Sequence, residues 1–346
     1  MIDINSPKEK KIESFLKLIL RKEAYIDDNI LLKEISENNI GFTSLNEIDP
    51  KEKILLIPSK LLITKENFTN FLLNKKLNFY DEELINLYFS ILPNLTFFKE
   101  NNVLYLNQSD KNICLSLFKN DSPIKKSIEN LFNSFNNLEN DIEKYTYLLF
   151  RTRSFRVNGQ SYLAPLLDSM NYNFSTRGYF VENDSVYFNS EKKLKKNEEI
   201  FQSYNLKVDP IKFFLNYSFF PSNYSNLTFA ENQLILNVPK STISKIDSKY
   251  WNIYKDQAIS NKNSISFYDC KVPLILNLMF ESLSINNNLK NKTIYNFLTV
   301  VKNQFNINEI NLCAENKNYN PILNDFAKSI KLYVSNLDKI LDKIQN

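Results

Sequence analysis

The chain contains no histidine among its 346 residues. Imidazole is the general base of serine–histidine and cysteine–histidine enzymes, so both kinds of catalytic site are excluded. Imidazole is also a common zinc ligand, so any zinc site that uses histidine is excluded as well. Only three glycines are present, Gly41, Gly159 and Gly178. A GxGxxG dinucleotide loop or a Walker loop needs several glycines close together, so neither can be built. The same shortage argues against a Rossmann-like methyltransferase.

Cysteine is equally scarce. The three cysteines, Cys114, Cys270 and Cys313, lie far apart in the sequence and form no CxxC pair. This spacing favours neither a disulfide framework nor a structural zinc cluster, and we expect no metal site. The net charge is +4, from 43 basic and 39 acidic side chains. Nucleic-acid binders usually carry a strongly basic surface, so we expect no nucleic-acid partner.

Long apolar runs are absent as well. No stretch approaches the roughly 18–20 residues that a membrane span requires. The apolar segment 15–20 is short and has charges on both sides, which is typical of a helix rather than of a signal peptide. We therefore expect a soluble intracellular protein, cytoplasmic or nuclear, that is not secreted, does not bind membranes and is monomeric. Its 43% apolar content suffices for one large domain or up to three modest ones.

The spacing of apolar residues predicts an order of β, α, β and α segments. Helices are predicted at 6–23, 81–91, 127–150, the first part of 209–219, 241–259, 273–284, 294–305 and 321–344. Strands are predicted at 40–43, 53–58, 179–181, 185–188 and 199–204, and one strand pair is expected after residue 223. Residues 103–118 fit a hairpin or a distorted helix equally well.

Two segments in the first half of the chain suit a bound small molecule. The first is Asn38–Phe42 followed by Ile48–Pro58, where Gly41 permits close approach of the backbone to a ligand. The second is Thr152-Arg153-Ser154-Phe155, whose guanidinium can bind a carboxylate through two hydrogen bonds. Taken singly, the first segment is also compatible with an ordinary strand–turn–strand, and the second with a solvated arginine.

Two further segments follow. Residues 163–172 read Leu-Ala-Pro-Leu-Leu-Asp-Ser-Met-Asn-Tyr, and the asparagine, Asn171, offers both donors and an acceptor. Residues 196–205 and 213–219 carry Tyr204 and Tyr217, which stand 13 residues apart. Alone, the first segment is also compatible with a helix-to-loop segment of the core, and the second with two core tyrosines in a tyrosine-rich chain.

Together, in this order and spacing, the four segments resemble the SET domain of the RuBisCO large-subunit methyltransferases. The resemblance covers nearly the whole chain and is strongest over 150–220. It implies an α+β fold, in which the small sheets of the SET β-fold are interrupted by a helical insertion and followed by an all-helical domain. The implied division is 1–64 (N-terminal helix and first part of SET), 65–147 (insertion), 148–222 (C-terminal part of SET with the cofactor and lysine-channel motifs) and 223–346 (helical substrate-binding-like domain).

The resemblance implies an S-adenosyl-L-methionine-dependent protein-lysine N-methyltransferase, whose substrate is a lysine side chain of another protein. It makes Tyr204 the catalytic residue and places Arg153, Asp168 and Tyr217 on the substrate side, with Asp168 fixing either Arg153 or the peptide. The implied cofactor-binding residues are Asn39, Ile40, Gly41, Arg153, Asn171, Tyr172 and Phe219. Such a transfer needs no histidine, which agrees with the composition.

Four positions depart from the family pattern. Tyr172 replaces a histidine, Asn205 and Ser218 replace glycines, and the first glycine of the turn near Asn39 is missing. Because all four fall at the implied cofactor pocket, two alternatives stay open. One is a catalytically degenerate SET-fold protein that acts as a protein-binding module. The other is a histidine-directed protein methyltransferase on the same fold.

Overall fold

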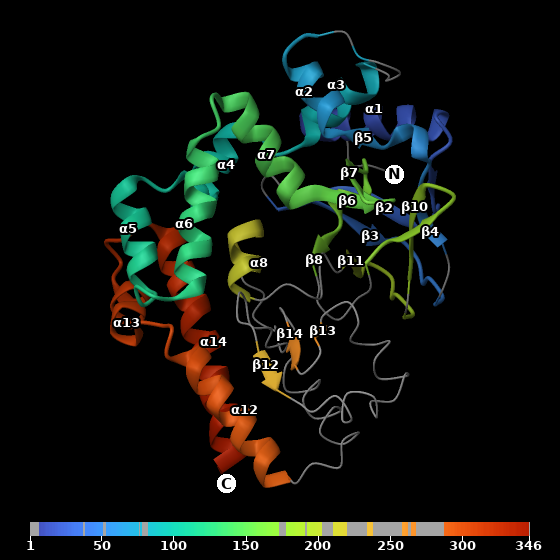
Figure 1. Cartoon of the computed structure of the whole chain (residues 1–346). Coiled ribbons are helices and arrows are strands. Elements are labelled where there is room, and N and C mark those ends of the chain that lie inside the picture. The colour runs from blue at the N-terminus through green and yellow to red at the C-terminus, as the bar shows by residue number, and fades with distance from the viewer. Residues whose placement is uncertain are drawn as a thin grey trace. The chain divides into compact units, whose positions relative to one another are not determined.

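The structure, a computed structural model, describes residues 7–36, 39–50, 53–75, 77, 82–172, 178–190, 192–202, 210–219, 234–237, 258–261, 264–267 and 287–345 (Figure 1). Tyr204, Asn205 and the predicted helix 273–284 lie outside these residues. The chain divides into two compact units. Unit 1 comprises Met1–Glu100 and Leu138–Leu206, and unit 2 comprises Asn101–Asn137 and Lys207–Asn346. The predicted insertion 65–147 is thus shared between both units, and the four-part division stays a prediction.

Unit 1 contains three small sheets. The first has the order β1-β4-β10-β9, with bounds Tyr25–Ile26, Lys53–Ile57, Ser185–Asn189 and Phe180–Glu182. The second has the order β2-β3-β11-β8, with bounds Ile30–Ser36, Asn39–Ser44, Glu199–Gln202 and Asn171–Tyr172. The third has the order β5-β7-β6, with bounds Ile63–Thr64, Gln160–Leu163 and Ser154–Val157.

Strands from the two ends of unit 1 pair with one another. In Figure 1 the blue strands β3 and β4 lie beside the green strands β11 and β10. Ile200 pairs with Phe42 in antiparallel register, whereas Phe201 pairs with Asn171 in the parallel pair β11–β8. The second sheet therefore brings β3, β11 and β8 together, and these strands carry the first, fourth and third of the four segments.

Helices cover these sheets. The helices of unit 1 are α1 (Pro7–Arg21), α2 (Lys65–Leu72), α3 (Glu82–Ile91) and α7 (Asp141–Arg153). The unit also has two 3-10 turns, η1 (Ser59–Leu61) and η3 (Leu167–Ser169). A further helix, α4 (Leu95–Asn101), ends at the unit boundary. α1 packs against α3, where Phe15 stacks on Tyr88 with ring centroids 5.9 Å apart. Both side chains are fully buried, so this contact anchors α3 in the core of unit 1.

The predicted single helix 127–150 was wrong, because the structure has two helices there. Four residues, 137–140, separate the end of α6 (Pro123–Asn136) from the start of α7. Asn140 marks the start of the second helix: its side chain accepts a hydrogen bond from the backbone N–H of Glu143, as an N-cap does. Residues 103–118, left open between a hairpin and a helix, form η2 (Val103–Tyr105) and α5 (Gln108–Ser116).

Unit 2 is built mainly of helices. Besides α5 and α6 it contains α8 (Pro210–Tyr217), α12 (Asn287–Lys302), α13 (Ile307–Glu315) and α14 (Pro321–Gln345). The long α14, red in Figure 1, contacts α5, α8, α12 and α13. Its buried residues recur every three or four positions, and Phe326 packs on Phe214 with ring centroids 4.9 Å apart. The helix predicted at 321–344 is confirmed, whereas α13 was not predicted.

One small sheet accompanies these helices. It has the order β12-β14-β13, with bounds Leu234–Asn237, Ser264–Phe267 and Ala258–Asn261. The predicted helix 241–259 is therefore wrong at its last two residues, and its remainder lies outside the described residues. The α+β class is confirmed, with one sheet added to the helices of the C-terminal region. Among the described ranges, no helix combines the length and the apolar composition that crossing a membrane requires.

Candidate functional site

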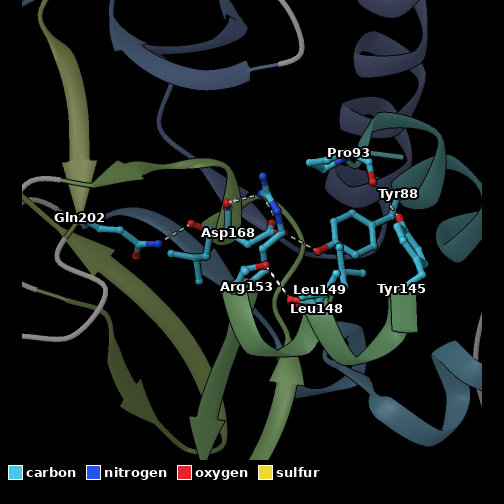
Figure 2. A network of polar contacts seen from close by, with 10 residues as sticks. Tyr88, Pro93, Tyr145, Leu148, Leu149, Arg153, Asp168 and Gln202 are labelled. Carbon is cyan, nitrogen blue, oxygen red and sulfur yellow. Dashed lines mark hydrogen bonds and ion pairs between the residues drawn. The ribbon is translucent and has the colours of Figure 1, made fainter. Parts of the chain in front are cut away.

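The centre of the candidate site is Arg153, the last residue of α7. Its Nη1 atom donates a hydrogen bond to the backbone oxygen of Asp168 at 2.7 Å and lies 3.5 Å from Oδ2 of the same residue (Figure 2). The Asp168 side chain is completely buried, whereas that of Arg153 keeps 23% of its surface exposed. The contacts with Asp168 therefore hold Nη1 of the guanidinium against the core, while the side chain as a whole stays partly exposed.

Asp168 is a buried carboxylate with two protein partners. Besides Arg153, the hydroxyl of Tyr88 donates a hydrogen bond to Oδ2 at 2.6 Å. Burial raises the pKa of the Asp168 carboxyl, while Arg153 and Tyr88 act in the opposite direction. Burial, and then the charge of Asp168, raise the pKa of Tyr88 well above its ordinary value. Burying a charge is unfavourable unless it is paired and hydrogen-bonded. Both contacts reach Oδ2, whereas Oδ1 of Asp168 is buried without a hydrogen-bond partner among the described residues, so the carboxylate is only partly compensated.

The turn that carries Asp168 is held in an unusual conformation. Leu166, fully buried, has φ 78° and ψ −49°, which is close to a γ-turn that bulky residues rarely adopt. Such strain costs on the order of 1–3 kcal/mol and persists only where surrounding contacts impose it. One such contact comes from Gln202, whose Nε2 donates to the backbone oxygen of Leu167 at 2.9 Å (Figure 2). The turn leads directly into β8.

Asn171 is the first residue of β8, and its amide orientation is fixed by Glu199 of β11. Its Nδ2 atom donates to Oε1 of Glu199 at 2.6 Å. An ionised carboxylate can only accept hydrogen bonds, so the amino end of the amide must face Glu199. The carbonyl oxygen, Oδ1, is therefore the end of the amide that does not face Glu199, and it can accept a hydrogen bond from a ligand.

Gly41 lies in β3 beside this pair. A Cβ atom on Gly41 would lie 2.9 Å from Cγ1 of Ile35 and 3.1 Å from Nδ2 of Asn171. The sequence predicts that this glycine admits a cofactor close to the backbone. In the structure the neighbouring space holds side chains of the same unit, so the glycine lets Asn171 and Glu199 approach β3.

The other predicted residues of unit 1 have simpler surroundings. Ile40 is buried in β3 and pairs with Glu34 of β2. Asn39 and Tyr172 contribute their backbones to β3 and β8, where Asn39 pairs with Ser36. Their side chains are outside the described part of the structure.

Tyr217 and Phe219 belong to unit 2, where they form an aromatic cluster with Phe213 at the end of α8. The ring of Phe213 lies 4.6 Å from that of Tyr217 and 5.2 Å from that of Phe219, measured between centroids. Phe219 remains 40% exposed. Between them Ser218 has φ 58°, in the left-handed region, and its N–H donates to the oxygen of Phe214 at 2.7 Å. This conformation favours glycine, which the related motif has at this position.

Three residues of the site were missed in the sequence. Glu199 belongs to the fourth segment, and strand alternation could have placed it on the same face as Phe201. Gln202 lies two residues before Tyr204 and its burial was not foreseen. Tyr88 gave no signal of its own, since it sits on an ordinary amphipathic helix 80 residues from Asp168.

Comparison with known proteins gives a clear likeness in structure but none in sequence. No protein-family model and no curated protein matches the chain. The chain has the fold of a SET-domain protein. Within that class it is similar to the SET domain of LSMT bound to lysine and AdoHcy, with 14% identity and a TM-score of 0.56 over 99% of this chain and 92% of that one.

Two further solved structures show the same likeness. Rubisco LSMT bound to sinefungin and monomethyllysine gives 14% identity and a TM-score of 0.57, over 99% of this chain and 92% of that one. Rubisco LSMT bound to AdoMet gives 13% identity and a TM-score of 0.55, over 98% and 92%. The SET fold of the RuBisCO large-subunit methyltransferase type, predicted from the four segments, is confirmed.

Proposed function

We propose that the chain is an S-adenosyl-L-methionine-dependent protein-lysine N-methyltransferase. The observation that carries this proposal is the arrangement of Arg153, held by Asp168, in the same unit as Asn171, held by Glu199. The similar structures contain AdoMet, AdoHcy or sinefungin, and some of them also contain lysine or monomethyllysine.

The two polar groups fit the amino-acid part of this cofactor, which carries one carboxylate and one ammonium group. The guanidinium of Arg153, whose side chain is partly exposed, binds the carboxylate, because its planar donors match two carboxylate oxygens. The Oδ1 atom of Asn171 accepts from the ammonium group. The backbones of Asn39, Ile40 and Tyr172 complete the cofactor-binding set of unit 1. The cofactor role of Phe219, which belongs to unit 2, stays a separate prediction. When bound, the cofactor supplies an electrophilic methyl group on a sulfonium.

The substrate side must deliver a neutral amine. A lysine side chain has a pKa near 10.4, and lowering it by about 3 units needs roughly 4 kcal/mol, which burial and a nearby positive charge can provide. In this proposal Tyr204 orients the amine and Tyr217 forms a wall of the lysine channel. Aromatic faces attract an alkylammonium by about 0.5–2 kcal/mol, so such a wall retains the substrate without a histidine.

Methyl-transfer labelling tests the proposal. The full chain is incubated with S-adenosyl-L-methionine labelled in its methyl group and a lysate of the source organism, and labelled proteins are identified by mass spectrometry. We expect label on lysine. Tyr204→Phe should lose most transfer while still binding cofactor, and the control Tyr187→Phe, in β10, should transfer as the wild type does.

The alternatives give different results in the same experiment. Label on histidine would contradict a lysine-directed enzyme and support the histidine-directed one. Bound cofactor without any labelled protein would support the protein-binding module. Unchanged transfer by Tyr204→Phe would show that another residue is catalytic.

A further inference from the structure

Three elements meet at Asp168, and one of them has no role in the function proposed above. Arg153 comes from α7 and Asp168 from η3, whereas Tyr88 comes from α3 (Figure 2). The Tyr88 side chain is fully buried, and its ring stacks on Phe15 of α1 at an interplanar angle of 26°. A ring that is buried and stacked in this way cannot readily rotate or shift, so its hydroxyl has a fixed position in the core.

That point is the oxygen of Asp168 that also faces Arg153. Tyr88 donates to Oδ2 at 2.6 Å, and Nη1 of Arg153 lies 3.5 Å from the same oxygen. The hydrogen bond from Tyr88 therefore sets the rotation of the carboxylate. The carboxylate, together with the backbone oxygen of Asp168, sets the position of the guanidinium.

We propose that Tyr88 is a positioning residue: through Asp168 it holds the Arg153 guanidinium in the orientation that binds the carboxylate of the cofactor. This inference rests on the proposed function. A long arginine side chain that is partly exposed has many accessible rotamers, and each must be given up when a ligand binds. Fixing the guanidinium beforehand lowers that entropic penalty and so raises affinity.

A second buried tyrosine provides the matched control. Tyr145, on α7 like Arg153, donates its hydroxyl to the backbone oxygen of Pro93 at 2.9 Å (Figure 2). Replacing either tyrosine by phenylalanine deletes one hydroxyl from the core of unit 1. Only Tyr88 donates to the carboxylate that pairs with Arg153, so only Tyr88→Phe should affect binding of the cofactor carboxylate.

Calorimetry with two ligands distinguishes positioning from general stability. The first ligand is S-adenosyl-L-methionine and the second is its decarboxylated form, which lacks the group that Arg153 binds. Because the hydrogen bond that Tyr88→Phe deletes is made to a charged group, the variant should bind the first ligand about tenfold more weakly. Its affinity for the second ligand should equal that of the wild type. Tyr145→Phe should match the wild type with both.

Kinetics give an independent check. Tyr88→Phe should raise KM for S-adenosyl-L-methionine and leave kcat at saturating cofactor close to that of the wild type. If Tyr88→Phe fails to fold, Asp168→Asn provides a second route, because it still accepts from Tyr88 but weakens the contact with Arg153. It should show the same selective loss of affinity for the carboxylate-bearing ligand.

The possible outcomes distinguish the positioning role of Tyr88 from the proposed function. Equal affinity of the wild type and Tyr88→Phe for S-adenosyl-L-methionine, or an equal loss with both ligands, overturns the positioning role and leaves the proposed function intact. A wild-type chain that binds neither ligand overturns both.

Discussion

The aromatic cluster of unit 2 and the polar site of unit 1 differ in how their residues are brought together. At the end of α8, Phe213, Tyr217 and Phe219 lie within seven positions of one another in the sequence, and a single helix end makes them neighbours. Around Asp168 the partners are 15 and 80 positions away, on separate elements. The aromatic cluster depends on local structure, whereas the polar site depends on the whole of unit 1. Mutations should therefore act differently on the two.

The largest effect is expected from Arg153→Met, which leaves the buried carboxylate of Asp168 without its cation. Removing one partner of a buried ion pair typically destabilises by 3–5 kcal/mol, and because Arg153 is partly exposed we expect about 3 kcal/mol, measured by urea unfolding. The control is Lys99→Met, which removes the exposed ion pair with Asp141 and should cost less than about 1 kcal/mol. Equal losses would show that the Asp168 contacts are no stronger than a surface pair.

Gly41→Ala should have the next largest effect. Its Cβ would crowd Ile35 and displace the amide of Asn171, and overpacking of this kind costs about 1–3 kcal/mol. Affinity for S-adenosyl-L-methionine should fall as well. Gly159→Ala is the comparison, because its Cβ meets nothing within 4 Å but its φ of 82° strains the backbone. It should lose about 1–2 kcal/mol of stability and no affinity. Unaltered binding of S-adenosyl-L-methionine by Gly41→Ala would show that β3 does not contribute to the cofactor site.

Asp168 should make stability depend on pH. Its folded-state pKa is raised above the ordinary value of 3.8, so the folded chain holds this proton to higher pH than the unfolded chain does. The contribution to stability is complete below about 3.8 and is lost as the pH rises through the folded-state pKa. The wild type should therefore lose stability relative to Asp168→Asn as the pH rises from about 3.8. Urea unfolding of both proteins over a pH series measures the difference, and parallel curves would contradict it.

Glu199→Gln should weaken cofactor binding modestly. The glutamine can still accept from Asn171, but a neutral hydrogen bond is weaker than a charged one by about 1 kcal/mol, which corresponds to roughly fivefold in affinity. The adjacent Glu198→Gln is the control, because Glu198 accepts instead from the backbone N–H of Lys195 in a turn. Calorimetry with S-adenosyl-L-methionine compares them, and identical affinities would exclude Glu199 from orienting Asn171.

The smallest effect concerns the aromatic cluster. Ser218→Gly relieves the left-handed conformation at φ 58° and should stabilise by about 0.5–1 kcal/mol in thermal unfolding. Ser329→Gly, within α14, should instead destabilise by about 0.5–1 kcal/mol. Loss of stability in Ser218→Gly would mean that the serine hydroxyl contributes more than the backbone strain removes.

The contrast between local structure and tertiary pairing also explains how much of the fold and of the candidate site the sequence predicts. Elements defined by local periodicity, such as α1, α3 and α14, follow from apolar spacing. The break at Asn140 was missed because apolar spacing continues across it and only the cap reveals it. In the site, Arg153 and Asn171 are visible as segments, but the partners that orient them, Tyr88 and Glu199, come from tertiary pairing that one sequence does not reveal.

The most direct test of the central claim is a calorimetric titration of the full chain with S-adenosyl-L-methionine, beside the same titration of Arg153→Met. We predict saturable binding of one molecule per chain, strongly weakened in the variant because the cofactor carboxylate loses its guanidinium. Absence of binding at millimolar cofactor, or equal affinity of the two proteins, would contradict the claim that unit 1 holds the cofactor through Arg153.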